Sequence, residues 1–255
     1  YNTELNQSIE SLLLAPFLEE ITKGIFLLYF IQKGNFYKLT DGLIYGGAIG
    51  IGFGIIENIL YFLFYGETFS DLIMIVTLRT FSTSTMHCVS TTVLGAFLSL
   101  AKFYKLNRKI IYFFSGFFLA VIIHFLWNLS VIYIESSLLK FLFLILLMLI
   151  FIVAFWIFIR IENKIIFKKL LEEANNGFFP FEYIPILSSH RKNKKGWIEE
   201  RIRKQYIHTA ISLSFKKKIS KKTIISSNKM KNTDKKYKEE IDYYRNYLQN
   251  LISNL

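Results

Sequence analysis

The pattern of hydrophobic and polar positions divides the chain into a long apolar part and a shorter polar part. A helix rises about 1.5 Å per residue, so about 20 mostly apolar residues cross a hydrocarbon core about 30 Å thick. This pattern predicts an all-α polytopic membrane helix bundle with at least five transmembrane helices. The five predicted spans are Leu12–Ile31, Gly42–Phe64, Leu72–Leu100, Ile110–Ile134 and Leu138–Ile159.

After the last span the sequence becomes polar and basic, but it keeps helical patterns. The charged segment Arg160–Ala174 should continue the last span until Asn175-Asn-Gly interrupts it. An amphipathic helix over Trp197–Phe215, a basic linker over Lys216–Lys222 and a last helix over Asp234–Leu255 are then expected. We therefore predict a transmembrane domain over residues 1–160 and a basic helical tail over residues 161–255.

Composition and charge support the same division. Hydrophobic residues make up 53% of the 255 residues, and the mean hydropathy is +0.36. Residues 1–159 contain nine Lys or Arg and nine Asp or Glu, whereas residues 160–255 contain 22 and 10, so the tail carries the whole net charge of +12. These numbers exclude a soluble globular enzyme and a disordered protein. The single cysteine, Cys88, excludes a disulfide scaffold.

The loops between the predicted spans indicate the orientation in the membrane. Lys and Arg occur in the loops at 32–41 and 101–109 and in the tail, but not at 1–11, 65–71 or 135–137. Because short cytoplasmic loops are enriched in these residues, we expect an integral, multi-pass protein of the cell membrane whose tail is cytoplasmic. The tail should meet anionic lipid. It contains no recognisable aromatic-basic module, so no nucleic-acid partner is expected.

Charged and polar residues recur inside four of the predicted spans. Such residues are costly at membrane depth and normally face a bundle interior or a wet cavity. They are Glu19, Glu20 and Lys23 in the first span, Glu57 and Asn58 in the second, Arg79 and His87 in the third, and His124 and Asn128 in the fourth. Counted from the predicted outer ends, Glu19, Glu57, His124 and Asn128 lie at a similar depth of about 9–15 Å. The alignment predicts one shared site.

A structural interpretation exists for each group by itself. Glu19 and Lys23 could form an ion pair within their helix, with Glu20 neutralised by Arg79, and a single buried His or Asn commonly bonds neighbouring helices. Taken together, the residues exceed what four packed helices need. Gly42, Gly46, Gly50 and Gly54 recur at every fourth position, which predicts close helix packing that would hold Glu57 against a neighbouring span.

Two kinds of hydrolytic chemistry suit this set of residues. A desolvated carboxylate can take a proton from water, while imidazole and amide groups stabilise an oxyanion. Alternatively, Glu57, His87 and His124 could hold Zn²⁺ as a set of one carboxylate and two histidines, with Glu20 or Glu19 as the base. No HExxH motif is present, so the sequence leaves metal dependence open.

At these positions the chain resembles the PrsW family of intramembrane proteases, distant relatives of the CaaX-processing and bacteriocin-processing membrane proteases. The matching residues are Glu19-Glu20-x-x-Lys23, Phe53-x-x-x-Glu57-Asn58, His87 after Arg79, and His124-x-x-x-Asn128, within about residues 11–135. The CaaX-processing relatives have an Arg one position after Lys23 and a His in place of Glu57. The resemblance implies an enzyme that hydrolyses peptide bonds of membrane-anchored substrates, such as anti-sigma factors.

The predicted roles follow from the residue types. Glu19 and Glu20 activate water, and His87 with Glu57 positions the water or binds a metal. His124 and Asn128 stabilise the oxyanion, while Lys23 and Arg79, supported by Asn58, tune the ionisation of the carboxylates. Two other functions remain open, namely an ion-coupled transporter that uses buried Glu and His, and a non-catalytic membrane scaffold of the same fold.

Overall fold

A computed structural model describes residues 10–32, 38–65, 68–102, 106–224 and 231–253, and this part of the chain consists of helices joined by turns and short irregular segments, without strands. The chain divides into two compact units, the first ending at Trp156 and the second running over Ile157–Leu255. The elements that start in the first unit are η1 (Glu10–Leu14, a π-helical turn), α2 (Ala15–Gln32), α3 (Leu39–Tyr65), α4 (Phe69–Phe81), α5 (Thr83–Lys102), α6 (Leu106–Tyr133) and α7 (Ser137–Asn175). Those of the second unit are η2 (Phe181–Tyr183), α8 (Ile184–Leu187), η3 (His190–Asn193), α9 (Glu200–Ile224) and α10 (Lys231–Ser253).

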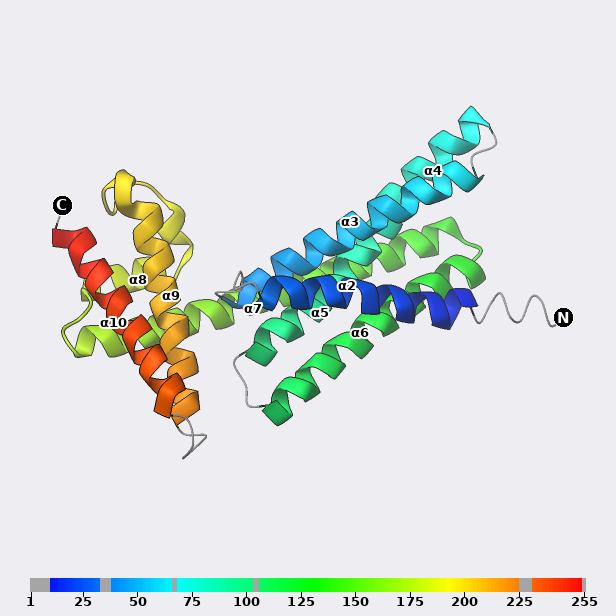
Figure 1. The fold of residues 1–255 in the computed structure, drawn as a ribbon. Helices are drawn as coiled ribbons and strands as arrows, with labels where there is room; N and C mark the ends of the chain where they lie inside the picture. Colours follow the sequence, from blue (N-terminus) through cyan, green and yellow to red (C-terminus); the bar gives the residue numbers. More distant parts are fainter. Residues whose placement is uncertain (1–9, 33–37, 66–67, 103–105, 225–230, 254–255) are drawn as a thin grey trace. The chain divides into compact units, whose positions relative to one another are not determined.

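Helices that could cross a membrane confirm the predicted all-α membrane bundle. Four stretches within the described residues are long and apolar enough, namely Leu39–Phe64, Arg79–Lys102, Arg108–Tyr133 and Leu138–Asn175. The helix of the first predicted span, α2, is not among them, because its 18 residues include Glu19, Glu20 and Lys23. As Figure 1 shows, α2 lies beside α3, α5 and α6 in the first unit.

The third predicted span is not one continuous helix. The helix is interrupted at Ser82, between α4 and α5, and the stretch that could cross a membrane, Arg79–Lys102, starts later than the predicted span Leu72–Leu100. Hydroxyl side chains next to the break bond to the backbone, as where Thr85 Oγ1 donates to the Phe81 carbonyl at 2.6 Å. Such bonds compete with the helical ladder and favour bends. The break allows Arg79 and His87 to approach from two separate helices.

The glycine row on α3 packs against the backbone of α5, as its spacing predicts. A Cβ atom at Gly46 would lie 2.5 Å from the Thr91 carbonyl oxygen, and one at Gly54 would lie 2.9 Å from Ser84 Cα. Gly42 and Gly50 are equally close to α5 backbone. Any side chain at these positions would push the helices apart, so the row brings Glu57 of α3 next to His87 of α5.

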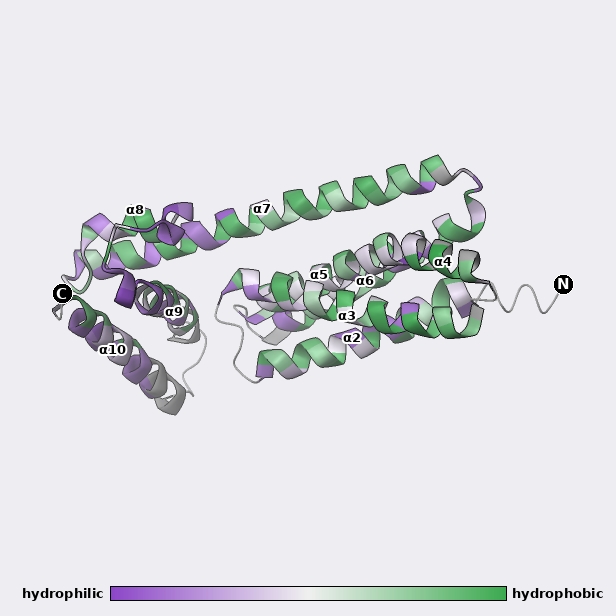
Figure 2. Ribbon diagram, turned by 90° about the horizontal axis from the view of Figure 1, so that it is seen from above, coloured by the Kyte–Doolittle hydropathy of each residue, from purple (hydrophilic) through white to green (hydrophobic). Residues whose placement is uncertain are grey.

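Burial in the first unit is concentrated in α5. In the apolar stretch Arg79–Lys102, which contains α5, 72% of the most apolar segment is buried, whereas in Leu138–Asn175 of α7 the share is 11%. The helix α5 therefore forms the centre of the bundle. Leu27, Leu94 and Phe117 from α2, α5 and α6 share one apolar core. The first part of α7 is strongly hydrophobic (Figure 2) and largely exposed. Exposed apolar helix surface of this kind suits contact with lipid.

The second unit has a core of its own. The helix α7 continues to Asn175, as predicted, and ends at a turn in which Gly177 has a φ of 78°. The ring of fully buried Tyr206 packs against Tyr183 and Trp197 at centroid distances of 5.6 and 6.2 Å. Burial raises the pKa of the Tyr206 hydroxyl, which therefore stays neutral.

The predicted basic linker over residues 216–222 is wrong, because α9 runs through it to Ile224. Two lysines of this segment form ion pairs with carboxylates from other helices. Lys216 Nζ lies 2.5 Å from Glu240, and Lys217 forms an ion pair with fully buried Glu173, which also receives Arg245 Nε at 2.6 Å. Internal charge pairing thus makes the segment part of the folded unit.

Candidate active site

Four helices and the short α4 bring the predicted site residues to one place in the first unit. Glu19, Glu20 and Lys23 come from α2 and Glu57 and Asn58 from α3. Arg79 ends α4, His87 lies on α5, and His124 and Asn128 lie one turn apart on α6. All nine residues therefore contribute to one polar cluster, which is the juxtaposition that their depth in the predicted spans suggests.

Lys23 is the centre of one half of the cluster. Its ammonium group is fully buried and lies 2.8 Å from Glu20 Oε1 and 3.5 Å from Glu19 Oε2. It also lies 2.7 Å from His87 Nδ1 and 4.3 Å from the centre of the Phe53 ring. One buried cation therefore orders both carboxylates of α2 and a histidine of α5.

Glu57 is the centre of the other half. Arg79 Nη2 donates to its Oε1 at 2.6 Å, and the guanidinium also donates through Nε to the Asn58 side-chain oxygen at 3.1 Å. Asn58 in turn donates to Ser84 Oγ at 3.0 Å. The expectation that Arg79 would neutralise Glu20 in a purely structural arrangement is wrong, since the partner of Arg79 is Glu57.

The neighbours of the two histidines determine which ring nitrogen carries a proton. A protonated Lys23 has no acceptor, so His87 Nδ1 must accept from it and Nε2–H donates to Glu57 Oε2 at 2.6 Å. In His124, Nδ1 lies 3.2 Å from Glu20 Oε1 and donates to this carboxylate. The lone pair of neutral His124 is then on Nε2, which lies 3.8 Å from Glu19 Oε2.

A cavity of about 210 Å³ opens beside these groups. Glu19, Glu57, Arg79, His87 and His124 line it together with Asn128 and Ser11 of η1. Fully buried Glu20 is not among the described lining residues. Glu19 differs, because its side chain is 23% exposed and lines the cavity. In both residues the Oε2 atom is buried and makes no hydrogen bond within the described part of the chain. Glu19 is thus the carboxylate of α2 that water in the cavity can reach.

Asn128 makes its hydrogen bond to a main-chain carbonyl. Its Nδ2 donates to the Ser11 oxygen in η1 at 2.9 Å. Ser11 and Asn128 both line the cavity. The amide of Asn128 is therefore placed where it can bind a peptide carbonyl next to Glu19 and His124.

Glu19, His87 and His124 form the group that could hold a metal ion. One ligand atom of each lies within 4.8 Å of the other two. The predicted set contains Glu57 in place of Glu19, but both oxygens of Glu57 bond to Arg79 and His87. Glu19 Oε2 and the lone pair of His124 Nε2 can accept a metal ion. His87 Nδ1 is engaged by Lys23 at 2.7 Å, so it could bind a metal ion only if the ammonium group left that nitrogen. Each histidine has a carboxylate on one nitrogen. Metal-binding histidines commonly have such carboxylate partners.

The sequence analysis missed two residues of the site. Ser90, one turn after His87 on α5, donates to Glu20 Oε1 at 3.0 Å and is fully buried. Tyr61, one turn after Glu57 on α3, lies under the Arg79 guanidinium at 3.4 Å from the ring centre. Each of these residues lies one helical turn from a predicted site residue, which could have indicated it. Ser and Tyr are so common in this chain, however, that this spacing alone does not identify them.

Comparison with known proteins assigns the family. Residues 2–157 match the model of the PrsW family of intramembrane metalloproteases. The chain belongs to this family. Protease PrsW of Shouchella clausii (strain KSM-K16) is 32% identical over 116 residues, which are 45% of this chain and 51% of that protein. Protease PrsW of Geobacillus kaustophilus (strain HTA426) is 28% identical over 116 residues, 45% of this chain and 48% of that protein.

The chain thus spans about half the length of the curated PrsW relatives that it matches. No solved structure matches it. Membership of the PrsW family favours an integral membrane peptidase that acts on protein over the transporter and scaffold alternatives. The match ends at residue 157, where the second unit begins, so it covers all of the polar cluster.

Proposed function

We propose that this protein hydrolyses a peptide bond of membrane-anchored proteins at the cavity beside Glu19. The observation that carries the proposal is the position of the Glu19 carboxylate. It lies on the cavity wall, is 23% exposed, and has Lys23 and His124 as neighbours. Glu20 also has an oxygen without a hydrogen bond, but it is fully buried, so access to the cavity singles out Glu19.

In this proposal Glu19 accepts the proton of the attacking water, because it is the carboxylate of α2 that meets the cavity. General-base assistance of this kind contributes about 10²–10⁴-fold to a rate. Glu20 has a positioning role instead. Its Oε1 accepts bonds from Lys23, Ser90 and His124 and so holds the ammonium group and the imidazole in place.

Asn128 is proposed to donate to the carbonyl oxygen of the scissile peptide. Its present bond to the Ser11 carbonyl supports this role, since a substrate carbonyl would need the same donor geometry. His124 was predicted to share the task. With Nδ1–H on Glu20 it has no proton to donate towards the cavity when neutral, so we assign it to the ligand set and not to the oxyanion.

Glu19, His87 and His124 would hold the metal that the family description implies once Lys23 has left His87 Nδ1, and Zn²⁺ suits one carboxylate and two imidazoles. Glu19 would then bind the ion through one oxygen and accept the proton with the other. The bound ion would act as a Lewis acid and make water more acidic. The chain's own contribution is orientation. Glu57 holds the His87 ring through Nε2, and Arg79 neutralises Glu57, while Glu19 and Glu20 share Lys23.

The tail is proposed to lie in the cytoplasm against anionic lipid. The distribution of Lys and Arg among the loops supports this orientation. Lys195 is exposed, and Arg201 has 75% of its side chain exposed, so basic groups are available on the surface of the second unit. Protease digestion of the tail should be slower in nanodiscs that contain phosphatidylserine than in nanodiscs of phosphatidylcholine alone.

The experiment for the proposed function uses purified full-length chain in nanodiscs and a single-span reporter protein tagged on both sides of its membrane helix. We expect two tagged fragments, metal in the pure protein, and loss of cleavage with a chelator that Zn²⁺ reverses. Glu19→Gln should lower both metal content and cleavage. Cleavage by the metal-free protein at an undiminished rate would refute the ligand assignment, and intact reporters across a panel of such proteins would refute the hydrolytic proposal.

A further inference from the structure

A basic loop of the tail is bound to α7 shortly after the apolar part of that helix. The loop covers residues 188–197, contains η3 and carries four Lys or Arg without an acidic residue. Lys192 Nζ donates a hydrogen bond to Asn163 Oδ1 of α7 at 3.2 Å. The loop therefore lies beside the segment of α7 that follows the apolar run Phe141–Ile159.

The position of Asn163 on α7 places this loop at the level of lipid headgroups. Because α7 is continuous over Ser137–Asn175, the helical rise gives the distances along it. The apolar run Phe141–Ile159 is about 28 Å long, close to the thickness of a hydrocarbon core. Asn163 follows Ile159 by about 6 Å, and the headgroup layer of each leaflet is about 5–8 Å thick. Tilting the helix would bring Asn163 still nearer to the hydrocarbon core.

Contacts inside the tail fix the conformation of the loop. Trp197 Nε1 donates to the Lys192 carbonyl at 3.2 Å. Arg203 Nη1 of α9 donates to the same carbonyl at 3.4 Å and to that of Asn193 at 3.2 Å. Gly196 has a φ of 88°, in the left-handed region that glycine adopts without strain. These bonds are accepted by backbone carbonyls, so the loop is ordered before a ligand binds to its side chains.

Several basic side chains of this ordered loop are available to a ligand. Those that are exposed and make no side-chain hydrogen bond or ion pair with the described part of the chain are Arg191, Lys194 and Lys195. Of the acidic residues that follow the loop, Glu199 contacts Arg201 at 3.3 Å. Glu200 contacts Arg203 at 3.0 Å. Residues 181–204 contain seven Lys or Arg and three Asp or Glu, so the segment has a surplus of four positive charges and favours an anionic ligand.

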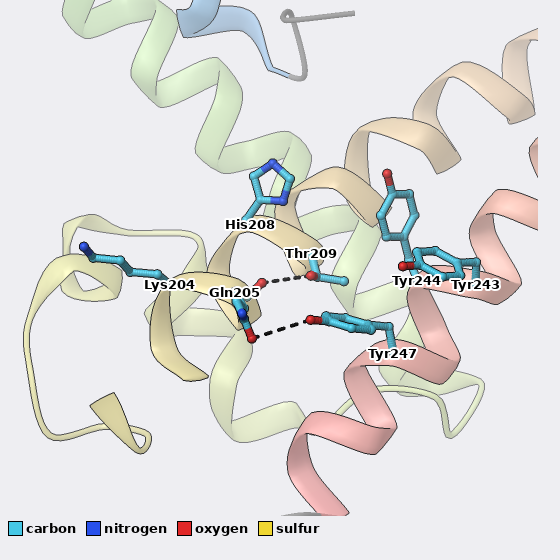
Figure 3. A pocket seen from close by; sticks show the side chains of 7 residues that line it. All are labelled: Lys204, Gln205, His208, Thr209, Tyr243, Tyr244 and Tyr247. Atoms are coloured by element: carbon cyan, nitrogen blue, oxygen red, sulfur yellow. Dashed lines mark hydrogen bonds between the residues drawn. The ribbon is translucent and has the colours of Figure 1, made fainter. Parts of the chain in front are cut away.

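The basic residues of α9 are arranged differently. The cavity between α9 and α10 has one lysine, Lys204, among the seven side chains that line it (Figure 3). Farther along α9, Lys216 pairs with Glu240. Lys217 pairs with buried Glu173. Adjacent cations without a partner in the described chain are thus found on the loop, where the membrane presents phosphate groups.

We propose that the loop over residues 188–197 binds the phosphate groups of anionic phospholipids in the membrane that α7 crosses. The guanidinium group of Arg191 can donate two parallel hydrogen bonds to one phosphate, while Lys194 and Lys195 contribute point charges. Indole side chains are frequent at the membrane interface, and Trp197 next to these cations fits that environment. Binding here rests on the lipid contact proposed above for the tail and would confine that contact to one loop.

The geometry of α7 favours a lipid over a nucleic acid. A helix that crosses the membrane holds the loop next to the headgroups, so lipid phosphates are present there at high effective concentration. Nucleic-acid binding usually needs a longer series of cations that follows successive phosphates. The unpaired cations of the loop lie within residues 191–195, which suits one or two headgroups.

Quenching of a fluorescent label on the loop tests the proposal with the full-length chain in nanodiscs. The single cysteine is removed by Cys88→Ala, and bimane is attached to Asn193→Cys. The quenchers are phosphatidylglycerol and phosphatidylcholine that carry a spin label near the headgroup, each added in increasing amounts to nanodiscs of phosphatidylcholine. We expect half-maximal quenching at a mole fraction of phosphatidylglycerol at least about tenfold below that of phosphatidylcholine, since each cation near the surface strengthens binding of anionic lipid about fivefold.

Substitutions on the loop should reduce this preference for phosphatidylglycerol. Arg191→Gln and Lys195→Gln should each lower it about fivefold, and the triple variant that adds Lys194→Gln should show no preference. The matched control is Lys168→Gln, which removes an exposed cation of α7 about 14 Å past the end of the apolar run, and it should change the preference less than about twofold. A label at Asn176→Cys, about 25 Å past the same point, should be quenched little by either lipid.

Three results would overturn the proposal. They are equal quenching by the two lipids at Asn193, equal quenching at Asn193 and Asn176, and a loss in Lys168→Gln as large as that in Arg191→Gln. A label that responds to an RNA oligonucleotide but not to phosphatidylglycerol would also overturn it.

The assay separates this lipid site from the other proposed functions. It measures no cleavage, so its outcome is independent of the proposed hydrolysis. If phosphatidylserine slows digestion of the tail while the label at Asn193 shows no preference for anionic lipid, the lipid contact of the tail lies outside this loop and the proposed site is refuted.

Discussion

The two units each bury a carboxylate among cations, but they do so in opposite ways. In the tail, Glu173 has both oxygens occupied, by Lys217 and by two nitrogens of Arg245. In the membrane unit, Glu19 and Glu20 each keep one buried oxygen without a hydrogen bond in the described residues. Histidines contact both carboxylates of the second arrangement, and Glu19 lines a cavity.

Structural and reactive charge clusters differ in how the oxygens of their carboxylates are occupied. Pairing both oxygens of a buried carboxylate leaves no uncompensated charge, as in the tail. A carboxylate such as Glu19, which has an oxygen without a hydrogen bond and lines a cavity, can accept a proton or a metal ion. Substitutions at Glu19, Glu173, Ser90 and Arg201 test this difference between the two units.

The largest effect should follow Glu19→Gln. The substitution keeps the volume of the side chain but removes its capacity to accept a proton, so cleavage should fall by about 10²–10⁴-fold. Because Glu19 is partly exposed to the cavity, the amount of folded protein should stay the same. Reporter cleavage normalised to monodisperse protein measures this. Near-full cleavage by Glu19→Gln would show that Glu19 is as structural as Glu173.

Glu173→Gln should produce the converse result, a loss of stability with cleavage largely retained. Removing one partner of a buried ion pair typically costs about 3–5 kcal/mol, because Lys217 and Arg245 lose their counter-charge. Thermal unfolding followed by proteolysis of the tail measures the effect. A tail of unchanged stability would contradict the structural role that we assign to this cluster.

A smaller effect is expected for Ser90→Ala. Hydrogen bonds to charged groups contribute about 1.5–3 kcal/mol, so losing the bond to Glu20 should lower kcat about tenfold to a hundredfold. A positioning role predicts that KM changes little and that Ser90→Thr restores part of the rate. The matched control is Ser99→Ala, at a buried serine on the same helix that makes no contact with Glu20. An equal loss in that control would indicate general damage to α5.

The smallest effect should follow Arg201→Gln, which breaks the exposed contact of Arg201 Nε with Glu199 at 3.3 Å. Exposed ion pairs contribute about 0–1 kcal/mol, so neither stability nor cleavage should change measurably. The same assays as for Glu173→Gln apply. A loss as large as that of Glu173→Gln would mean that burial does not distinguish the charge pairs of the tail.

The sequence by itself determined the fold class, most helix positions and the membership of the polar cluster. Long apolar segments can satisfy their backbone hydrogen bonds in lipid only as helices. Charged residues inside the membrane normally face the interior of the bundle, so they are expected to gather there. Gly42, Gly46, Gly50 and Gly54 similarly identified the helix face that packs closely. These properties follow from local pattern and length, which a single sequence displays.

Only the tertiary structure decided which partner each charged group meets. Arg79 pairs with Glu57 because α4 and α5 separate at Ser82, and Lys216 and Lys217 belong to a folded helix because Glu240 and Glu173 approach from elsewhere in the chain. The same holds for Glu19, which lies within 4.8 Å of ring nitrogens of His87 and His124 although the three residues come from three helices. Pairing depends on ångström distances between distant segments, and periodicity along the chain does not encode those distances.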